Sequence, residues 1–193
     1  RAGEDIREGE ILLPEGTLLR PQELGAIASL GISHVTVYRK LKVGYLSSGD
    51  EIVPYQTEKL SEGQIRDINF LTIAGLAQQW NVEVVYGGIV KDDFQEFQQK
   101  AESLYNEVDC LILSGGSSVG AKDYTTDVIQ SLGSPGVFVH GISIKPGKPT
   151  ILAMANGKPV IGLPGHPASA MIIFMLFGEK ILQKLKGEKI EKK

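Results

Sequence analysis

The sequence is poor in cysteine and has no long hydrophobic run. Its single cysteine, Cys110, cannot form an internal disulfide, which excludes a disulfide-stabilised scaffold and fits the cytoplasm. The longest apolar stretch, Met171 to Phe177, is too short to cross a bilayer, so we expect a buried helical segment and no membrane partner. The opening stretch RAGEDIREGE is polar and charged, unlike a signal peptide. Because the first residue is Arg1 rather than Met, we expect an excised domain or a processed product.

The chain also lacks an excess of charge of one sign. Its formal net charge is −3, with basic and acidic residues interspersed, which argues against a general nucleic-acid surface. Histidine is rare, and His34, His140 and His166 are scattered. We therefore see neither a Cys/His zinc cluster nor a Ser-His-Asp arrangement. With 193 residues, 42% of them hydrophobic, the chain is long enough for one sizeable core and a small appendage.

The first part of the chain, residues 1–39, is predicted to be a flap or part of a neighbouring domain. EILLPEGTLL has apolar residues on both sides of Pro14 and Gly16, which predicts two short strands around a turn. PQELGAIASLG predicts a helix with Pro21 in its first turn and Gly31 at its end. HVTVY predicts one more short strand.

Residues 40–193 alternate between strand and helix patterns and are predicted to form an α/β domain. Such alternation is typical of a three-layer αβα fold with a mostly parallel central sheet, here with a small N-terminal appendage. The turn at Asn156–Gly157 predicts a hairpin. Strands are expected in KVGYLSSGDEI, EVVYGGIV, DCLILSGG, GVFVHGISI and the hairpin PTILAMANGKPVIGLP, and helices in DINFLTIAGLAQQW, DDFQEFQQKAESLYNEV, TTDVIQSLG and from about Pro167 to Leu185, with 54–64 as an exposed connection.

The loop SGGSSVGAKDY follows an apolar strand and is the first candidate for ligand binding. Glycines let the backbone approach an anion closely, and Ser114, Ser117 and Ser118 add hydroxyl donors. A phosphate or another oxyanion would suit this loop, and a tight turn without a ligand is the alternative. Asp123 at its end would hold a divalent cation or orient water, or would cap the following helix; these roles can coexist.

Two lysines and several acids lie at further expected strand ends. Lys145 and Lys148 flank a Pro-Gly turn in IKPGKP, where they would bind an oxyanion or remain solvated surface lysines. The acids of SSGDEI and KDD offer hard oxygen ligands that suit Mg²⁺. For one of Asp92 and Asp93 we favour a helix-capping role. The acids of these two loops are Asp50, Glu51, Asp92 and Asp93. Asp67 and Asn69 are expected to cap the start of the helix DINFLTIAGLAQQW, and His166 is expected to shape the backbone of LPGHP.

Taken in order, these motifs resemble the molybdopterin molybdenumtransferase family, to which the C-terminal part of gephyrin also belongs. The resemblance covers nearly the whole chain, and the order of the motifs is more specific than any one of them. The matching stretches are RAGEDI, EILLPEGTLL, SSGDEI, GQIRDIN, GGIVKDD, SGGSSVGAKDY, IKPGKP and GLPGHP.

The resemblance implies a three-layer molybdopterin-binding domain, flanked in complete members by other domains. Such enzymes use adenylylated molybdopterin, and Mg²⁺ assists the release of AMP as molybdate is inserted; the active site is completed across a homodimer, so this fragment is expected to bind without turnover. A molybdopterin adenylyltransferase of the same fold and a non-catalytic scaffold module are the alternatives. By position, the resemblance implies acidic catalytic and metal-binding roles for Glu51, Asp92 and Asp123, a basic catalytic role for Lys145 with Lys148 beside it, phosphate or pterin contacts for Gly115, Gly116, Ser117, Ser118 and Gly120, and a neighbouring wall shaped by Pro164 and Pro167.

The sequence departs from the family pattern at three positions. His166 stands where the family usually has Asn, and Ile68 where it commonly has Ser or Thr. Gly141 stands where a basic residue often precedes the KPGK loop, with His140 as the nearby substitute. We therefore expect rearranged contacts to the pterin or the oxyanion.

Overall fold

The computed structural model describes residues 6–115 and 124–188, and the chain divides into two compact units. One comprises Arg1–Arg39 with Gln183–Lys193, and the other comprises Lys40–Leu182; each is described by itself. The domain boundaries expected from the sequence stay a prediction. Within the described ranges, no helix is both long enough and apolar enough to span a membrane.

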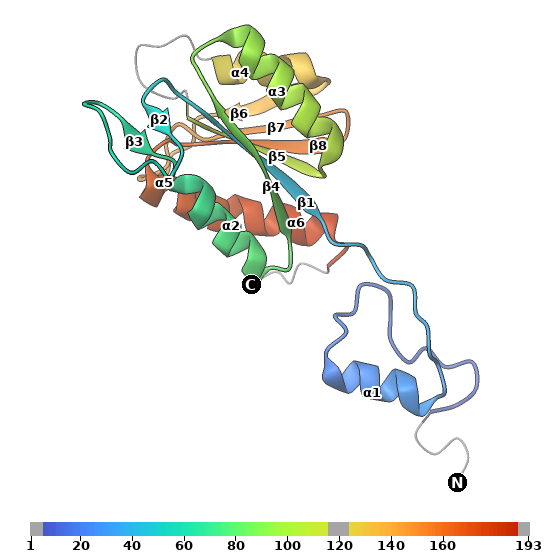
Figure 1. Cartoon of the computed structure of the whole chain (residues 1–193). Coiled ribbons are helices and arrows are strands. Elements are labelled where there is room, and N and C mark those ends of the chain that lie inside the picture. The colour runs from blue at the N-terminus through green and yellow to red at the C-terminus, as the bar shows by residue number, and fades with distance from the viewer. Residues whose placement is uncertain (1–5, 116–123, 189–193) are drawn as a thin grey trace. The chain divides into compact units, whose positions relative to one another are not determined.

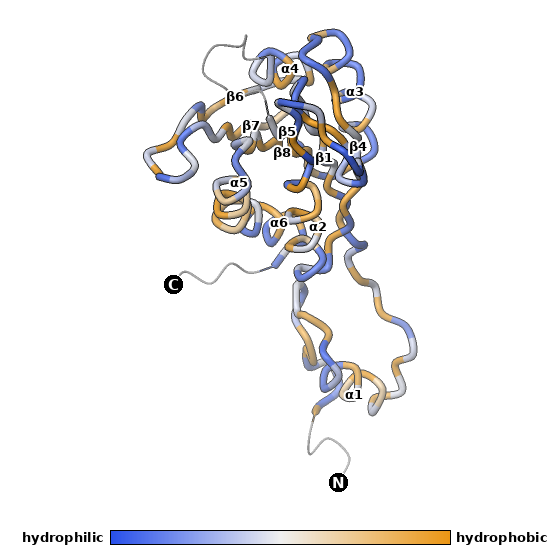
Figure 2. The backbone as a smooth tube through the Cα atoms, turned by 60° about the vertical axis from the view of Figure 1, so that its left-hand side comes forward, coloured by the Kyte–Doolittle hydropathy of each residue, from blue (hydrophilic) through white to orange (hydrophobic). Residues whose placement is uncertain are grey.

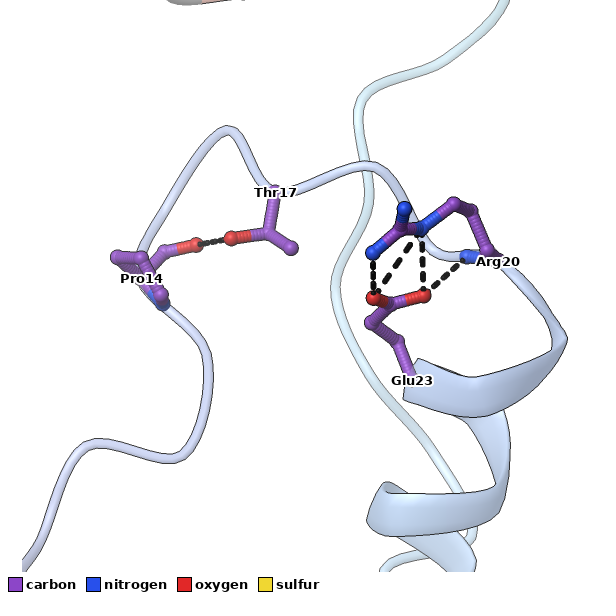
Figure 3. A network of polar contacts seen from close by, with 4 residues as sticks. All are labelled: Pro14, Thr17, Arg20 and Glu23. Carbon is purple, nitrogen blue, oxygen red and sulfur yellow. Dashed lines mark hydrogen bonds and ion pairs between the residues drawn. The ribbon is translucent and has the colours of Figure 1, made fainter.

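The first unit is built around helix α1, Pro21–Ser29. As predicted, Pro21 lies in the first turn, where its missing N–H costs nothing, and Gly31 follows the end with φ +75°. Two contacts between the same residues close the start of the helix: the Arg20 backbone N–H and guanidinium both donate to the Glu23 carboxylate (Figure 3). Just before it, the Thr17 hydroxyl donates to the Pro14 carbonyl at 2.6 Å and holds a turn.

The strands predicted in this unit are wrong. Residues 10–19 and 34–38 carry no strand, although the turn expected near Pro14 and Gly16 is present. Val35 and Val37 leave 45% and 62% of their surface exposed. β-branched residues favour a strand only where a partner strand and a packed face are available, and neither is found in the described part of this unit.

The second unit contains a six-stranded sheet in the order β4-β1-β5-β8-β7-β6. β1 pairs in parallel with β4 and β5, and β5 pairs in parallel with β8, whereas β7 is antiparallel to both of its neighbours. The predicted mostly parallel sheet is therefore confirmed. The strands are β1 Lys42–Ser48, β4 Glu83–Val90, β5 Cys110–Gly115, β6 Pro135–His140, β7 Ile151–Ala155 and β8 Lys158–Leu163; β2 Ile52–Val53 and β3 Ile65–Arg66 form a separate parallel pair beside the exposed connection.

Helices cover both faces of the sheet and complete the three layers (Figure 1). Helices α3 (Phe94–Glu107) and α4 (Tyr124–Leu132) lie on one face, and α2 (Asn69–Gln79) and α5 (Pro167–Ile173) on the other. The predicted helix from Pro167 to Leu185 is continuous but contains a π-helical turn. It runs through α5, η1 (Phe174–Gly178) and α6 (Glu179–Leu185).

The hydrophobic pattern of each segment explains where it lies. β5 is covered on both faces and is buried from Cys110 to Ser114, as its continuous apolar run predicts. Much of β5, β7 and β8 is coloured as hydrophobic in Figure 2. The amphipathic helix α3 buries Phe97, Ala101 and Leu104 against the sheet. Asn156 and Gly157 both have positive φ, which fits the two-residue turn predicted between β7 and β8.

Candidate ligand site at the carboxyl edge of the sheet

The candidate site lies where the carboxyl ends of the strands meet. β1, β4, β5 and β8 end at this edge because they are parallel, and β6 ends there too because it and β8 are both antiparallel to β7. In sheets of this kind, ligands bind just beyond the carboxyl ends. Most of the candidate residues follow these strands directly, in the segments 49–51, 91–93, 141–150 and 164–167.

The last residue of β5, Gly115, occupies a position that only glycine can fill without strain. It pairs with Ser48 at the end of β1 and has φ +114°, a conformation that side chains rarely adopt. A Cβ atom here would overlap the Ser48 carbonyl oxygen. The chain that follows, 116–123, lies outside the described residues, so the roles predicted for Gly116, Ser117, Ser118, Gly120 and Asp123 stay predictions.

The loop between β6 and β7 is closed by its own hydrogen bonds. The Gly141 N–H donates to the Thr150 carbonyl at 2.8 Å, and the Ile142 N–H donates to the Lys148 carbonyl at 2.9 Å. The Thr150 hydroxyl, fully buried, donates to the Gly147 carbonyl at 2.6 Å. The IKPGKP segment is therefore fixed to the sheet edge at both of its ends.

Packing against α5 holds the tip of the same loop. Gly147 has φ +128°, and a Cβ atom there would overlap the Ile173 side chain. Lys145 and Lys148, on either side of this glycine, are exposed. A rigid loop thus presents two cations at the edge, and their predicted role in binding an oxyanion stays a prediction.

The acids after β1 and β4 are close enough to influence one another. The Asp92 backbone N–H donates to Asp50 Oδ1 at 3.3 Å, and Lys91 Nζ donates to the Asp50 carbonyl at 3.2 Å. Burial raises the pKa of Asp92, and the negative charges of Asp50 and Glu51 raise it further. Among residues 6–115 and 124–188, no three His, Cys, Asp or Glu side chains are arranged to hold a metal. The Mg²⁺ ligands expected at Glu51 and Asp92 stay a prediction, because the third, Asp123, lies outside those residues.

Three residues of these loops, Asp93, His166 and Pro167, lie at the starts of helices. Asp93 caps α3 by accepting a hydrogen bond from the Glu96 N–H at 2.8 Å, which confirms that one acid of the KDD pair is a cap. His166 is exposed at the N-cap of α5, but its side chain makes no capping bond. Pro164 is buried, and the exposed Pro167 occupies the first turn of α5.

Asp67 holds a polar network beneath the edge, on the α2 side of the sheet. Its carboxylate accepts hydrogen bonds from the hydroxyls of Ser47 at 2.7 Å and Tyr86 at 2.9 Å. It also accepts a longer bond of 3.4 Å from the Phe70 N–H, which confirms part of the expected helix-capping role. Burial and this contact with Asp67 raise the pKa of Tyr86. The sequence did not indicate that a carboxylate only 4% exposed joins β1, β4 and α2.

Asn69, expected only as a helix cap, makes different contacts. Its Nδ2 donates to the Gly165 carbonyl at 2.8 Å and lies 3.5 Å from Ser114 Oγ. These partners belong to the loop after β8 and to the end of β5, so one side chain joins three segments of the edge. Sequence reasoning missed this role, because Asp-x-Asn before an apolar helix is equally typical of capping.

Four buried side-chain atoms lack a hydrogen-bond partner within the described residues: Ser48 Oγ, Asn69 Oδ1, Thr125 Oγ1 and the Tyr45 hydroxyl. Burial raises the pKa of Tyr45, and the neighbouring Ser114 lowers it by a smaller amount. The Tyr45 hydroxyl and Ser114 nevertheless do not meet the geometry of a hydrogen bond. Buried polar atoms normally have partners, and a polar ligand or bound water would satisfy them. Ser48 ends β1 at this edge, so a polar ligand bound there would satisfy its hydroxyl, and Thr125 lies in the first turn of α4.

Comparison with known proteins finds relatives named for molybdopterin biosynthesis. The chain is 39% identical over its full length to the molybdopterin molybdenumtransferase of Haemophilus influenzae and 35% identical over 92% of its length to a putative molybdopterin biosynthesis protein of Methanocaldococcus jannaschii. It spans about half of these relatives, 47% and 46%. A molybdopterin biosynthesis moeA protein from Pyrococcus horikoshii superposes with a TM-score of 0.80 at 38% identity, over 95% of this chain and 45% of that one.

More distant structures share the fold alone. The molybdopterin biosynthesis enzyme MoaB of Thermus thermophilus has a TM-score of 0.54 at 15% identity, over 78% of this chain and 99% of that one. The family model described as a probable molybdopterin binding domain matches residues 44–184, which include β4, β5, the loop between β6 and β7 and the loop after β8. The chain belongs to this family of probable molybdopterin-binding domains.

Proposed function

We propose that this chain is the molybdopterin-binding part of an enzyme that inserts molybdenum into molybdopterin. It would bind adenylylated molybdopterin at the carboxyl edge and take part in Mg²⁺-dependent insertion of molybdate with release of AMP. The observation that carries the proposal is the family match over 44–184, together with full-length likeness to a molybdopterin molybdenumtransferase. Because the chain spans about half of that relative, residues outside it would contribute to turnover.

The residues at the edge suit two anionic groups. Phosphate and molybdate are both oxyanions, and Lys145 and Lys148 would neutralise either of them. Gly115 would let the ligand approach the backbone at the end of β5. Glu51 and Asp92, with Asp123 as the third acid, offer the hard oxygen donors that Mg²⁺ prefers. When bound, Mg²⁺ would neutralise phosphate charge as AMP leaves.

The test is a turnover assay of the intact protein. Adenylylated molybdopterin, Mg²⁺ and molybdate are supplied together, and AMP and the molybdenum-loaded pterin are measured by chromatography. We expect AMP release that requires both Mg²⁺ and molybdate. Lys148→Gln should reduce it, whereas Lys100→Gln, which removes a lysine on α3, should not. Absence of AMP release from the intact protein would refute the proposal.

The same assay separates the alternatives. Supplying molybdopterin and ATP in place of the adenylylated form should give no adenylylated product, and its formation would favour an adenylyltransferase. A protein without affinity for molybdopterin in calorimetry would favour the scaffold module instead. We also propose that the intact protein is a cytoplasmic homodimer, which sedimentation and cell fractionation test.

A further inference from the structure

One buried amide, that of Asn69, connects three segments of the carboxyl edge. Asn69 begins α2 and is 8% exposed. Nδ2 donates at 2.8 Å to the carbonyl of Gly165, in the loop between β8 and α5. The same atom lies 3.5 Å from the hydroxyl of Ser114, which is 3% exposed and precedes Gly115. The side chain therefore connects the loop after β8 to the end of strand β5, and both are expected to face the ligand.

Helix capping does not account for this amide. A capping Asn accepts a backbone N–H through its side-chain oxygen, but Asn69 Oδ1 has no hydrogen-bond partner in the described residues. The N–H of Phe70 is instead taken by Asp67. The orientation of the amide is also fixed, because exchanging its oxygen and nitrogen would place two oxygens, Oδ1 and the Gly165 carbonyl, against each other.

The unpartnered oxygen shows that packing alone does not explain Asn69 either. A buried polar atom without a partner is unfavourable, and an apolar side chain of similar size would avoid that cost. The compensating interaction is made by Nδ2, which joins the loop after β8 to the end of β5. The described contacts of the Asn69 side chain therefore fix the distance between the loop after β8 and the end of β5.

We propose that Asn69 is a positioning residue of the ligand site: it clamps the Pro164–Pro167 loop to the end of β5 and so sets the width of the site between them. The clamp itself follows from the geometry. Its effect on ligand binding rests on the proposed function. Asn69 touches no reacting group in this role and acts through Ser114 and Gly165.

Amide hydrogen exchange of this chain tests the clamp directly. Asn69→Asp keeps the shape of the side chain but replaces the donor with an oxygen that faces the Gly165 carbonyl. Losing one buried hydrogen bond should speed exchange in 162–168 roughly fivefold, while α3 stays unchanged. Thr72→Ala is the matched control, because the Thr72 hydroxyl donates to the carbonyl of Ile68, the N-cap of α2, and among the described residues it contacts neither the loop after β8 nor the end of β5.

Equal exchange of 162–168 in Asn69→Asp and in the unsubstituted chain would overturn the clamp. If the new carboxylate prevents folding, Asn69→Ala removes the donor without adding a charge, and the same comparison decides. Faster exchange spread evenly over the whole chain would show a general loss of stability and would also count against a local clamp.

Binding of AMP with Mg²⁺, measured by calorimetry, tests the effect on the site. We expect roughly fivefold weaker binding in Asn69→Asp and no change in Thr72→Ala. Unchanged affinity in both variants would refute the positioning role. If the unsubstituted chain itself does not bind AMP, the proposed function loses support, while hydrogen exchange still decides whether Asn69 clamps the loop.

Discussion

Replacing Gly115, the last residue of β5, with Ala should markedly lower the free energy of unfolding. The residue has φ +114°, where a non-glycine residue costs about 1–3 kcal/mol. Its Cβ would also overlap the Ser48 carbonyl oxygen in the neighbouring strand, and relieving such overpacking costs about 1–3 kcal/mol more. Since β1 and β5 are both central and buried, the backbone cannot move aside freely.

Together these costs predict a loss of about 2–6 kcal/mol in the free energy of unfolding. Folded domains are stable by only about 5–15 kcal/mol, so the variant should remain marginally folded. For a chain of this size the melting temperature should fall by roughly 5–20 °C. Thermal unfolding followed by circular dichroism, with urea unfolding to give the free energy, measures both quantities.

Gly75→Ala is the matched control for this prediction. Gly75 is exposed within α2, and a Cβ there would meet no atom within 4 Å. Alanine is favoured over glycine inside a helix, so this variant should be more stable by about 0.5–1 kcal/mol. If Gly115→Ala melted at the same temperature as the unsubstituted chain, the conformation assigned to the end of β5 would be wrong.

Three smaller predictions concern single groups. Asp93→Ala removes the cap of α3 and should lower the free energy of unfolding by about 1 kcal/mol in urea, and an unchanged midpoint would contradict the capping bond. Burial raises the pKa of Cys110 from 9.0 to about 12, so a thiol reagent should label it only after unfolding. Because the unfolded thiol ionises first, it should lower the stability as pH rises above 9, by about 1.4 kcal/mol at pH 10, and Cys110→Ala should lose that much less than the unsubstituted chain. Burial and the charge of Asp50 raise the pKa of Asp92, so its ionised form weakens the fold above its ordinary pKa of 3.8. Asp50→Asn should therefore raise the melting temperature slightly at pH 7 and not at pH 3; a rise of equal size at both pH values would argue against this coupling.

The hydrophobic pattern predicted the second unit well, whereas in the first unit it predicted the helix and the turn but was wrong about the strands. The run from Cys110 to Ser114 has one stable solution, a strand covered on both faces, and the apolar spacing of α3 allows only one buried face. HVTVY has the same local preference for a strand, yet Val35 and Val37 are exposed and residues 34–38 form no strand. A strand forms only when a partner is present, and the local sequence does not reveal that partner.

The site was predicted at the level of loops rather than of contacts. Lysines and acids placed after apolar strands could be assigned to one edge, because parallel strands end together. The contacts of Asp67 and Asn69 were missed, since each depends on atoms far away in the sequence: Ser47 and Tyr86 for Asp67, and Gly165 for Asn69. Local spacing cannot distinguish these roles from helix capping.

The sequence by itself determined the layers of this protein, the hairpin at Asn156–Gly157 and the chemical character of its strand-end loops. Hydrophobic period and turn chemistry are local properties, so they can be read along the chain. Only the tertiary structure decided three further features. The Ser48 carbonyl oxygen excludes any side chain at position 115, Asp67 is buried beside two hydroxyl groups, and Asn69 connects the loop after β8 to the end of β5. Those facts depend on which distant atoms become neighbours, and packing of the whole chain decides that.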